Sequence, residues 1–68
     1  MTITTDDEYR RVLRRLDEDA ETLREQRAAL ARAGLSGEEV DWAMAPLLSF
    51  QADLEEEAEA YAARRRAT

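Results

Sequence analysis

The apolar positions between residues 6 and 33 recur at alternating steps of four and three, which places them on one face of an α-helix. This spacing is typical of helices that pack side by side in coiled coils. We therefore predict a helix over about residues 6–33 with one face turned to a partner helix. The predicted seam consists of Tyr9, Leu13, Leu16, Ala20, Leu23, Arg27 and Leu30.

Both ends of this helix carry local signals. Thr5 and Glu8 form a capping box, and the acidic first turn suits the positive end of the helix dipole. Gly34 can take the left-handed conformation that ends a helix. Ser36 and Glu39 form a second capping box directly afterwards, so we predict a turn at 34–36 and a new helix.

The second helix is predicted over about residues 37–65, with its stripe at the same spacing: Val40, Met44, Leu47, Gln51, Leu54, Ala58 and Tyr61. Pro46 lies inside it. Because proline lacks the backbone N–H and clashes with the preceding turn, we expect a kink near Trp42 to Pro46. The alternative is two shorter helices separated at that point.

Together these elements predict an all-α fold, an antiparallel two-helix hairpin that forms a single domain over residues 1–68. In the predicted register Tyr9 lies opposite Tyr61 or Ala62 and Leu16 opposite Leu54, and the basic run at 10–15 lies beside the acidic run at 55–59. A chain this short builds a marginal core, and without cysteine or histidine it lacks disulfides and the commonest zinc ligands. We therefore expect homodimerisation into a four-helix bundle.

The balance of charge bears on partners and location. The net charge of -6 argues against nucleic acid as the main partner and favours a basic protein such as a toxin. No apolar run approaches the ~18 residues that cross a membrane, and the first residues do not resemble a signal peptide. All ten basic residues are arginine, a bias typical of GC-rich genomes, so we expect a cytoplasmic bacterial protein without a membrane partner.

Catalytic and metal chemistry find little support in the sequence. The glutamates at 55–57 and 59 suggest calcium or a di-iron site, but di-iron helical bundles use Glu-x-x-His pairs and the chain has no histidine. Ser36 is used as a cap, and no histidine or lysine is present to activate a serine. We predict a non-enzyme with no catalytic residues, no cofactor and no metal.

Five residues are candidates for a protein interface: Trp42, Leu48, Phe50, Arg27 and Gln51. Trp42 points away from the predicted stripe, and aromatic residues are enriched at interface hot spots. Arg27 and Gln51 interrupt the two seams, as polar residues that fix register or oligomeric state do. The alternatives are that Trp42 packs into the bend and that Arg27 extends to the edge of the seam.

Two stretches resemble the N-terminal helical segment of HigA-type antitoxins and their relatives. They are the opening from Ile3 to Leu16, with its Ile-Thr start and Tyr9, and the ending from Pro46 to Tyr61, with Leu54 and Glu57. In that family the segment precedes a helix-turn-helix DNA-binding domain, whereas here the likeness ends before such a module and Ala62 replaces the family's usual glutamate. The resemblance implies a standalone helical hairpin, and these two departures from the family's pattern argue against operator binding.

Taken together, the sequence predicts a small acidic protein-protein interaction module. It would be antitoxin-like or regulatory and would act by binding a partner protein. The alternative is a self-assembling structural or scaffold protein with no foreign partner.

Overall fold

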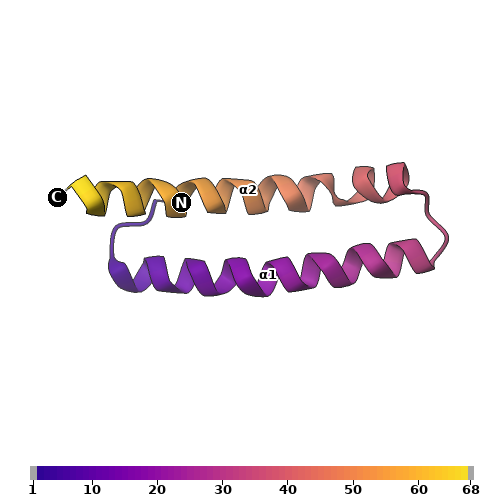
Figure 1. The fold of residues 1–68 in the computed structure, drawn as a ribbon, viewed down its shortest axis with the longest axis horizontal. Coiled ribbons are helices and arrows are strands. Elements are labelled where there is room, and N and C mark those ends of the chain that lie inside the picture. Colours follow the sequence, from indigo (N-terminus) through magenta and orange to yellow (C-terminus); the bar gives the residue numbers. More distant parts are fainter. Residues whose placement is uncertain (1, 68) are drawn as a thin grey trace.

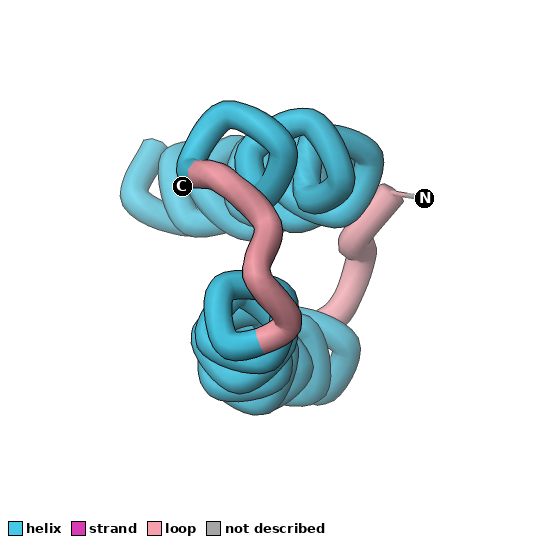
Figure 2. The backbone as a smooth tube through the Cα atoms, turned by 90° about the vertical axis from the view of Figure 1, so that its right-hand side faces the viewer, coloured by secondary structure: helices cyan, strands magenta, loops and turns pink. Residues whose placement is uncertain are grey.

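Two antiparallel helices make up almost the whole molecule. The structure is a computed structural model that describes residues 2–67, with α1 at Asp6–Arg32 and α2 at Gly37–Ala67. They lie side by side along most of the molecule (Figure 1), and the end-on view shows one helix stacked on the other (Figure 2). The particle measures 50 × 17 × 17 Å. The predicted all-α hairpin is confirmed.

The helix ends form as their local chemistry dictates. The Thr5 hydroxyl accepts a hydrogen bond from the Glu8 N–H at 3.1 Å. At α2 the Ser36 hydroxyl accepts from the Glu39 N–H at 3.2 Å, while the Glu39 carboxylate accepts from the Ser36 N–H at 2.9 Å. These reciprocal bonds satisfy N–H groups that have no partner within the helix.

The turn between the helices depends on one glycine. Gly34 has a φ of +97°, a left-handed conformation that is strained for residues with a Cβ. The N–H of Leu35 then reaches back to the carbonyl of Leu30 at 3.3 Å, which closes the end of α1. The chain thus reverses within four residues, and α2 starts at Gly37.

The densest core lies at the end of the hairpin opposite the turn. It is a cluster of buried side chains against which Tyr9 and Leu16 pack: Ile3, Val12, Leu54, Ala58 and Tyr61. The Tyr9 and Tyr61 rings are tilted against each other with centroids 5.1 Å apart. This contact matches the predicted pairing of the two tyrosines and gives aromatic attraction in addition to buried area.

The segment before α1 crosses to α2 and covers this core (Figure 1). Ile3 is 1% exposed, and its carbonyl accepts a hydrogen bond from Arg64 Nη2 at 2.9 Å. The Tyr61 hydroxyl donates to the Asp6 carboxylate, which also pairs with Arg65 at 3.4 Å. The first residues therefore close the hairpin, although the sequence pattern assigned Ile3 no place in the core.

The structure corrects two positions of the predicted seam. Val12 is buried where Leu13 was expected, and Leu13 is 41% exposed. A straight helix drifts about 20° per heptad against a strict seven-residue repeat, so the packed face moves from the Leu13 side to the Val12 side. Leu47 is also exposed, at 45%, because a hairpin has only two layers and covers each stripe from one side.

α2 continues through Pro46 as one helix, so the alternative of two separate helices does not apply. Its first two turns are set off from the remainder by an irregular stretch (Figure 1). Pro46 has no N–H to donate to the carbonyl of Trp42, so this acceptor loses its usual helical donor. The irregularity follows from the missing bond.

Charged side chains make pairs within and between the helices. Arg10 and Arg15 pair with Asp7 and Asp19 of α1, at 2.6 and 3.4 Å. Pairs between helices include Arg27 with Asp41 at 2.8 Å, near the turn. At the opposite end, the acidic first turn of α1 meets the last arginines of α2 in the contact between Asp6 and Arg65 at 3.4 Å.

Candidate interaction surface

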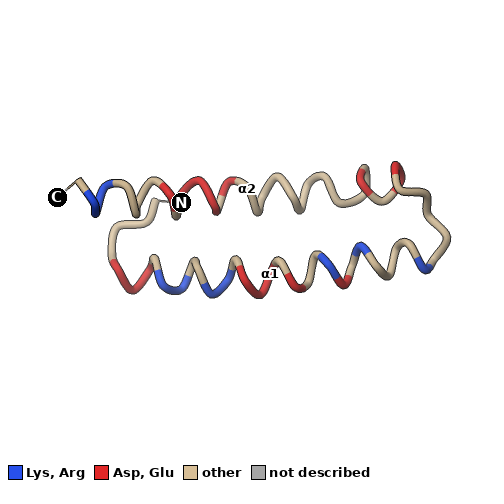
Figure 3. The backbone as a smooth tube through the Cα atoms, viewed as in Figure 1, with Lys and Arg blue, Asp and Glu red and all other residues tan. Residues whose placement is uncertain are grey.

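The middle of α2 presents an uncharged and largely exposed surface. Residues 42–52 contain no charged side chain and are bounded by Asp41 and Asp53. Figure 3 shows this stretch beside α1, which carries charges of both signs along its length. Four large apolar side chains of this stretch are exposed to solvent, in order of exposure Trp42 (83%), Phe50 (54%), Leu47 (45%) and Leu48 (41%).

Trp42 lies on the outer face of α2. Its neighbours in the chain, Val40 and Met44, are 3% and 1% exposed and point to the inside of the hairpin. Helical spacing puts Glu38 one turn before the indole and Pro46 one turn after it. Trp42 therefore does not pack into the bend, and it stands next to the carbonyl that Pro46 leaves without its helical donor.

Carboxylates surround this tryptophan. Glu38, Glu39 and Asp41 all lie within the four preceding residues, and Asp41 holds Arg27 of α1. The backbone N–H of Ser36, supported by its side chain, lowers the pKa of Glu39 below its ordinary value, so this carboxylate is ionised at neutral pH. The result is an acidic collar on the turn side of an exposed indole.

Phe50 borders a groove on one side of the hairpin. The groove has a volume of about 560 Å³ and adjoins a second hollow of about 260 Å³, and both are lined by Arg15 and Phe50. Val12 and Leu54 contribute to the apolar floor of the larger groove. The guanidinium of Arg15 lies 5.8 Å from the centroid of the Phe50 ring, a cation–π contact.

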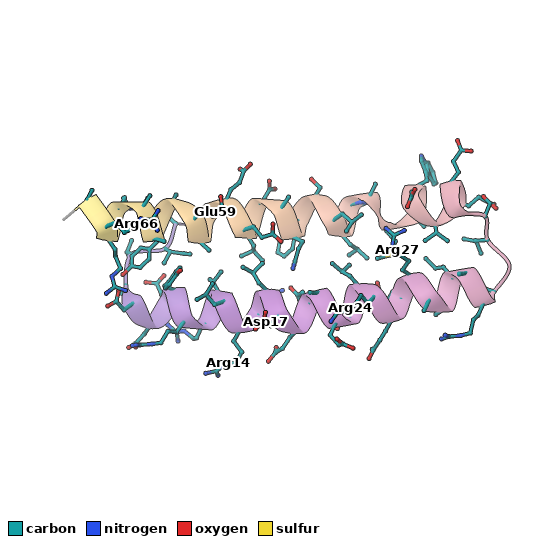
Figure 4. All side chains as sticks on the ribbon, viewed as in Figure 1. Arg14, Asp17, Arg24, Arg27, Glu59 and Arg66 are labelled. Carbon is teal, nitrogen blue, oxygen red and sulfur yellow. The ribbon has the colours of Figure 1, made fainter. Side chains whose placement is uncertain are left out.

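Leu48 faces the opposite side of the hairpin. It lines a hollow of about 280 Å³ together with Leu23, Met44 and Arg27. Arg27 reaches from α1 toward α2, whereas Arg14 projects away from the hairpin (Figure 4). Gln51 lies between the helices, where its side-chain amide donates to the Leu16 carbonyl at 3.1 Å. Both seam-interrupting residues thus have partners inside the hairpin.

The five residues predicted for an interface are therefore distributed over different sides of the hairpin and do not form one patch. Trp42 occupies the outer face, Phe50 one side, and Leu48 with Arg27 the other. Val12, Leu47 and the charged walls of the Phe50 groove were absent from the prediction. The uncharged run 42–52 could have indicated Leu47, because a single helix face cannot bury so long an apolar stretch, but no sequence signal indicates the groove.

Two other classes of feature, a metal site and a membrane-spanning helix, are absent from the described part of the chain. Among residues 2–67, no three acidic side chains are grouped so that they could hold a metal ion. Neither helix of this part combines the length and the apolar character that crossing a membrane requires. Comparison of the chain with models of protein families, with curated proteins and with solved structures finds no match.

Proposed function

We propose that this chain is a protein-protein interaction module that binds a basic partner protein through the face around Trp42. The observation that carries the proposal is an 83% exposed indole on a helix, with a collar of carboxylates beside it. Tryptophan is the side chain most enriched at interface hot spots, and burying it supplies a large apolar area.

Three features of this face favour a basic partner. The indole ring attracts an arginine or lysine by a cation–π contact, worth more once the pair is desolvated. Glu38 and Glu39 supply negative charge within one turn of the ring. The Trp42 carbonyl, next to Pro46, can accept a hydrogen bond from the same cation. The net charge of -6 would also steer such a partner toward the surface.

The biological role we propose is antitoxin-like or regulatory. A small acidic module that covers a basic surface can block it, which is how many inhibitory partners act. The likeness of the two sequence stretches to the N-terminal segment of HigA-type antitoxins supports the same role. A self-assembling scaffold with no foreign partner is the competing function, and the exposed apolar residues of α2 are what favours it.

We further propose that the module acts as a homodimer, a four-helix bundle of two hairpins. Seven hydrophobic residues are buried among residues 2–67. Domains of this size commonly obtain additional burial from a second copy.

The test is capture of the partner followed by binding measurements. The tagged chain is purified from its host, and a basic protein recovered in fixed ratio is produced separately. Trp42 is the only tryptophan, so its emission reports directly on this face. Binding should shift the emission to shorter wavelength, and Trp42→Ala should weaken affinity about thirtyfold or more, as expected for a hot spot.

A matched control is Leu48→Ala, which removes an exposed apolar side chain from another side of the same helix. It should retain the affinity of the unchanged protein. Equal binding by the Trp42→Ala variant would refute the Trp42 face. Recovery of the chain alone, in assemblies that grow with concentration, would favour the scaffold.

A further inference from the structure

The Phe50 groove offers a second surface, separate from the outer face of α2. Its apolar floor is Val12, Phe50 and Leu54, and it runs between the two helices. A partner seated on Trp42 would approach from the far side of α2 and leave this floor in contact with water.

The two walls of the groove carry opposite charge. Arg11 and Arg15 line it from α1, with Glu8 at the end of that wall, while Asp53 and Glu57 line it from α2. The contact of Leu16 with Gln51 fixes the level of the two antiparallel helices. Counted from this contact in opposite directions, Arg15 lies within one residue of the level of Asp53, and Arg11 within one residue of the level of Glu57.

We propose that a second copy of this chain closes the Phe50 groove, related by a two-fold axis parallel to the helices. This operation places α1 of each copy over α2 of the other, so every neighbouring pair of helices is antiparallel. The basic wall of each copy then meets the acidic wall of the other at the same level, and the two apolar floors meet each other. A single surface serves both copies, as a two-fold interface requires.

A two-fold axis in the interface but perpendicular to the helices would not have this property. It would set α1 over α1 and α2 over α2. When centred on the groove, it brings arginines toward arginines and carboxylates toward carboxylates, which is repulsive. The charge pattern therefore selects the parallel axis.

The exposed area of the hairpin matches what such a contact would remove. The chain exposes 5205 Å², whereas a folded monomer of this mass exposes about 4,400 Å². The excess of roughly 800 Å² equals the share that each partner buries in an interface of standard size. One further hairpin on one face accounts for this area.

This inference rests on the proposed homodimer and deepens it, because it assigns the dimer contact to a surface other than the Trp42 face and gives its symmetry. The first test compares Phe50→Glu with Leu48→Glu by sedimentation velocity, with circular dichroism to verify helicity. Phe50→Glu should raise the dimer dissociation constant at least tenfold, while Leu48→Glu, an equal change on the opposite side, should leave it within about twofold. The reverse order, or a chain that is monomeric at every concentration, would overturn the proposal.

The second test uses the charged walls. One variant carries Arg11→Glu with Arg15→Glu and presents two acidic walls; the other carries Asp53→Arg with Glu57→Arg and presents two basic walls. Each alone should be monomeric, and an equimolar mixture should form a heterodimer. Mixtures that stay monomeric, although both variants are helical, would contradict the proposed contact.

The axis is tested by cross-linking. Arg15→Cys and Asp53→Cys chains should form a disulfide with each other when mixed, because α1 of one copy lies over α2 of the other. Predominant Arg15→Cys homodimers would indicate the perpendicular axis and refute the proposal. Emission of Trp42 should not change upon dilution through the dimer equilibrium, whereas it should change with the basic partner, so the two proposals fail independently.

Discussion

The two ends of the hairpin use their apolar residues differently. At the terminal end, Ile3, Val12 and Leu54 are packed with two tyrosines into a buried cluster. At the turn end, Val40 and Met44 are buried, but the same stretch of α2 exposes Trp42, Leu47 and Leu48. One end is closed by the crossing N-terminal segment, whereas no third element among residues 2–67 covers the other end.

In this pair of helices, the residues that stabilise the fold are concentrated at the terminal end, and the residues available for binding are concentrated at the turn end. Two helices can cover only a narrow line of contact, so a wide apolar stripe needs a third element. The terminal end obtains it from its own chain, in the form of residues 2–5. The turn end has none, and its apolar residues are left for other molecules.

Loss of packing at the terminal end should give the largest effect. Leu54→Ala removes a 7% exposed side chain from the core cluster and should lower the free energy of unfolding by about 3 kcal/mol. The paired change at the turn end, Leu47→Ala, should cost less than ~1 kcal/mol because Leu47 is 45% exposed. Urea unfolding followed by circular dichroism at one protein concentration measures both. Equal costs would abolish the distinction between the ends.

Removal of the covering segment's anchor should come next. Ile3→Ala leaves a cavity against Tyr61 and Leu54 and should cost about 2 kcal/mol, less than Leu54→Ala because a short extended segment can adjust to the loss. Thermal unfolding is a suitable measurement. A change within ~0.5 kcal/mol would show that the segment does not stabilise the hairpin.

The pH dependence of the terminal end should depend on Tyr61. The hydrogen bond to the Asp6 carboxylate, followed by burial, raises the pKa of Tyr61 above its ordinary value of about 10. A raised pKa in the folded state gives stability that is fully present below pH 10 and is lost as pH rises through the raised value. Melting temperatures between about pH 8 and 11 should therefore fall more steeply for the unchanged protein than for Tyr61→Phe. Parallel curves would show that this bond does not contribute.

The smallest effect on stability is expected at the most exposed residue. Trp42→Ala should change the free energy of unfolding by less than ~0.5 kcal/mol, because the indole makes few contacts within the hairpin. Chemical denaturation of this variant provides the check. Unfolding of the hairpin would place Trp42 in its core.

Much of the architecture was predictable because it is encoded locally. The capping boxes at Thr5 and Ser36 and the glycine at 34 define where helices start and end, and each acts within four residues. The seven-residue repeat identified most of the facing residues, including Tyr9 and Tyr61. Such signals depend on neighbouring positions and need no knowledge of the remainder of the chain.

The positions that were missed depend on contacts between distant residues. In the sequence Ile3 is an isolated apolar residue in a polar N-terminal segment. It is buried because it contacts residues at the other end of the chain, such as Tyr61 and Arg64. The choice between Val12 and Leu13 depends on how far a straight helix rotates away from an ideal repeat. For the candidate surface, periodicity predicted that Trp42 faces outward, but it gave no indication of the groove beside Phe50.

The contrast between the two ends is tested most directly by amide hydrogen exchange, measured residue by residue on the Phe50→Glu variant as a monomer. The contrast predicts the slowest exchange in α2 at 54–61 and in the facing turns of α1, and faster exchange at 42–50, where Pro46 removes a bond and side chains are exposed. Uniform protection along α2, or slowest exchange at the turn end, would contradict it.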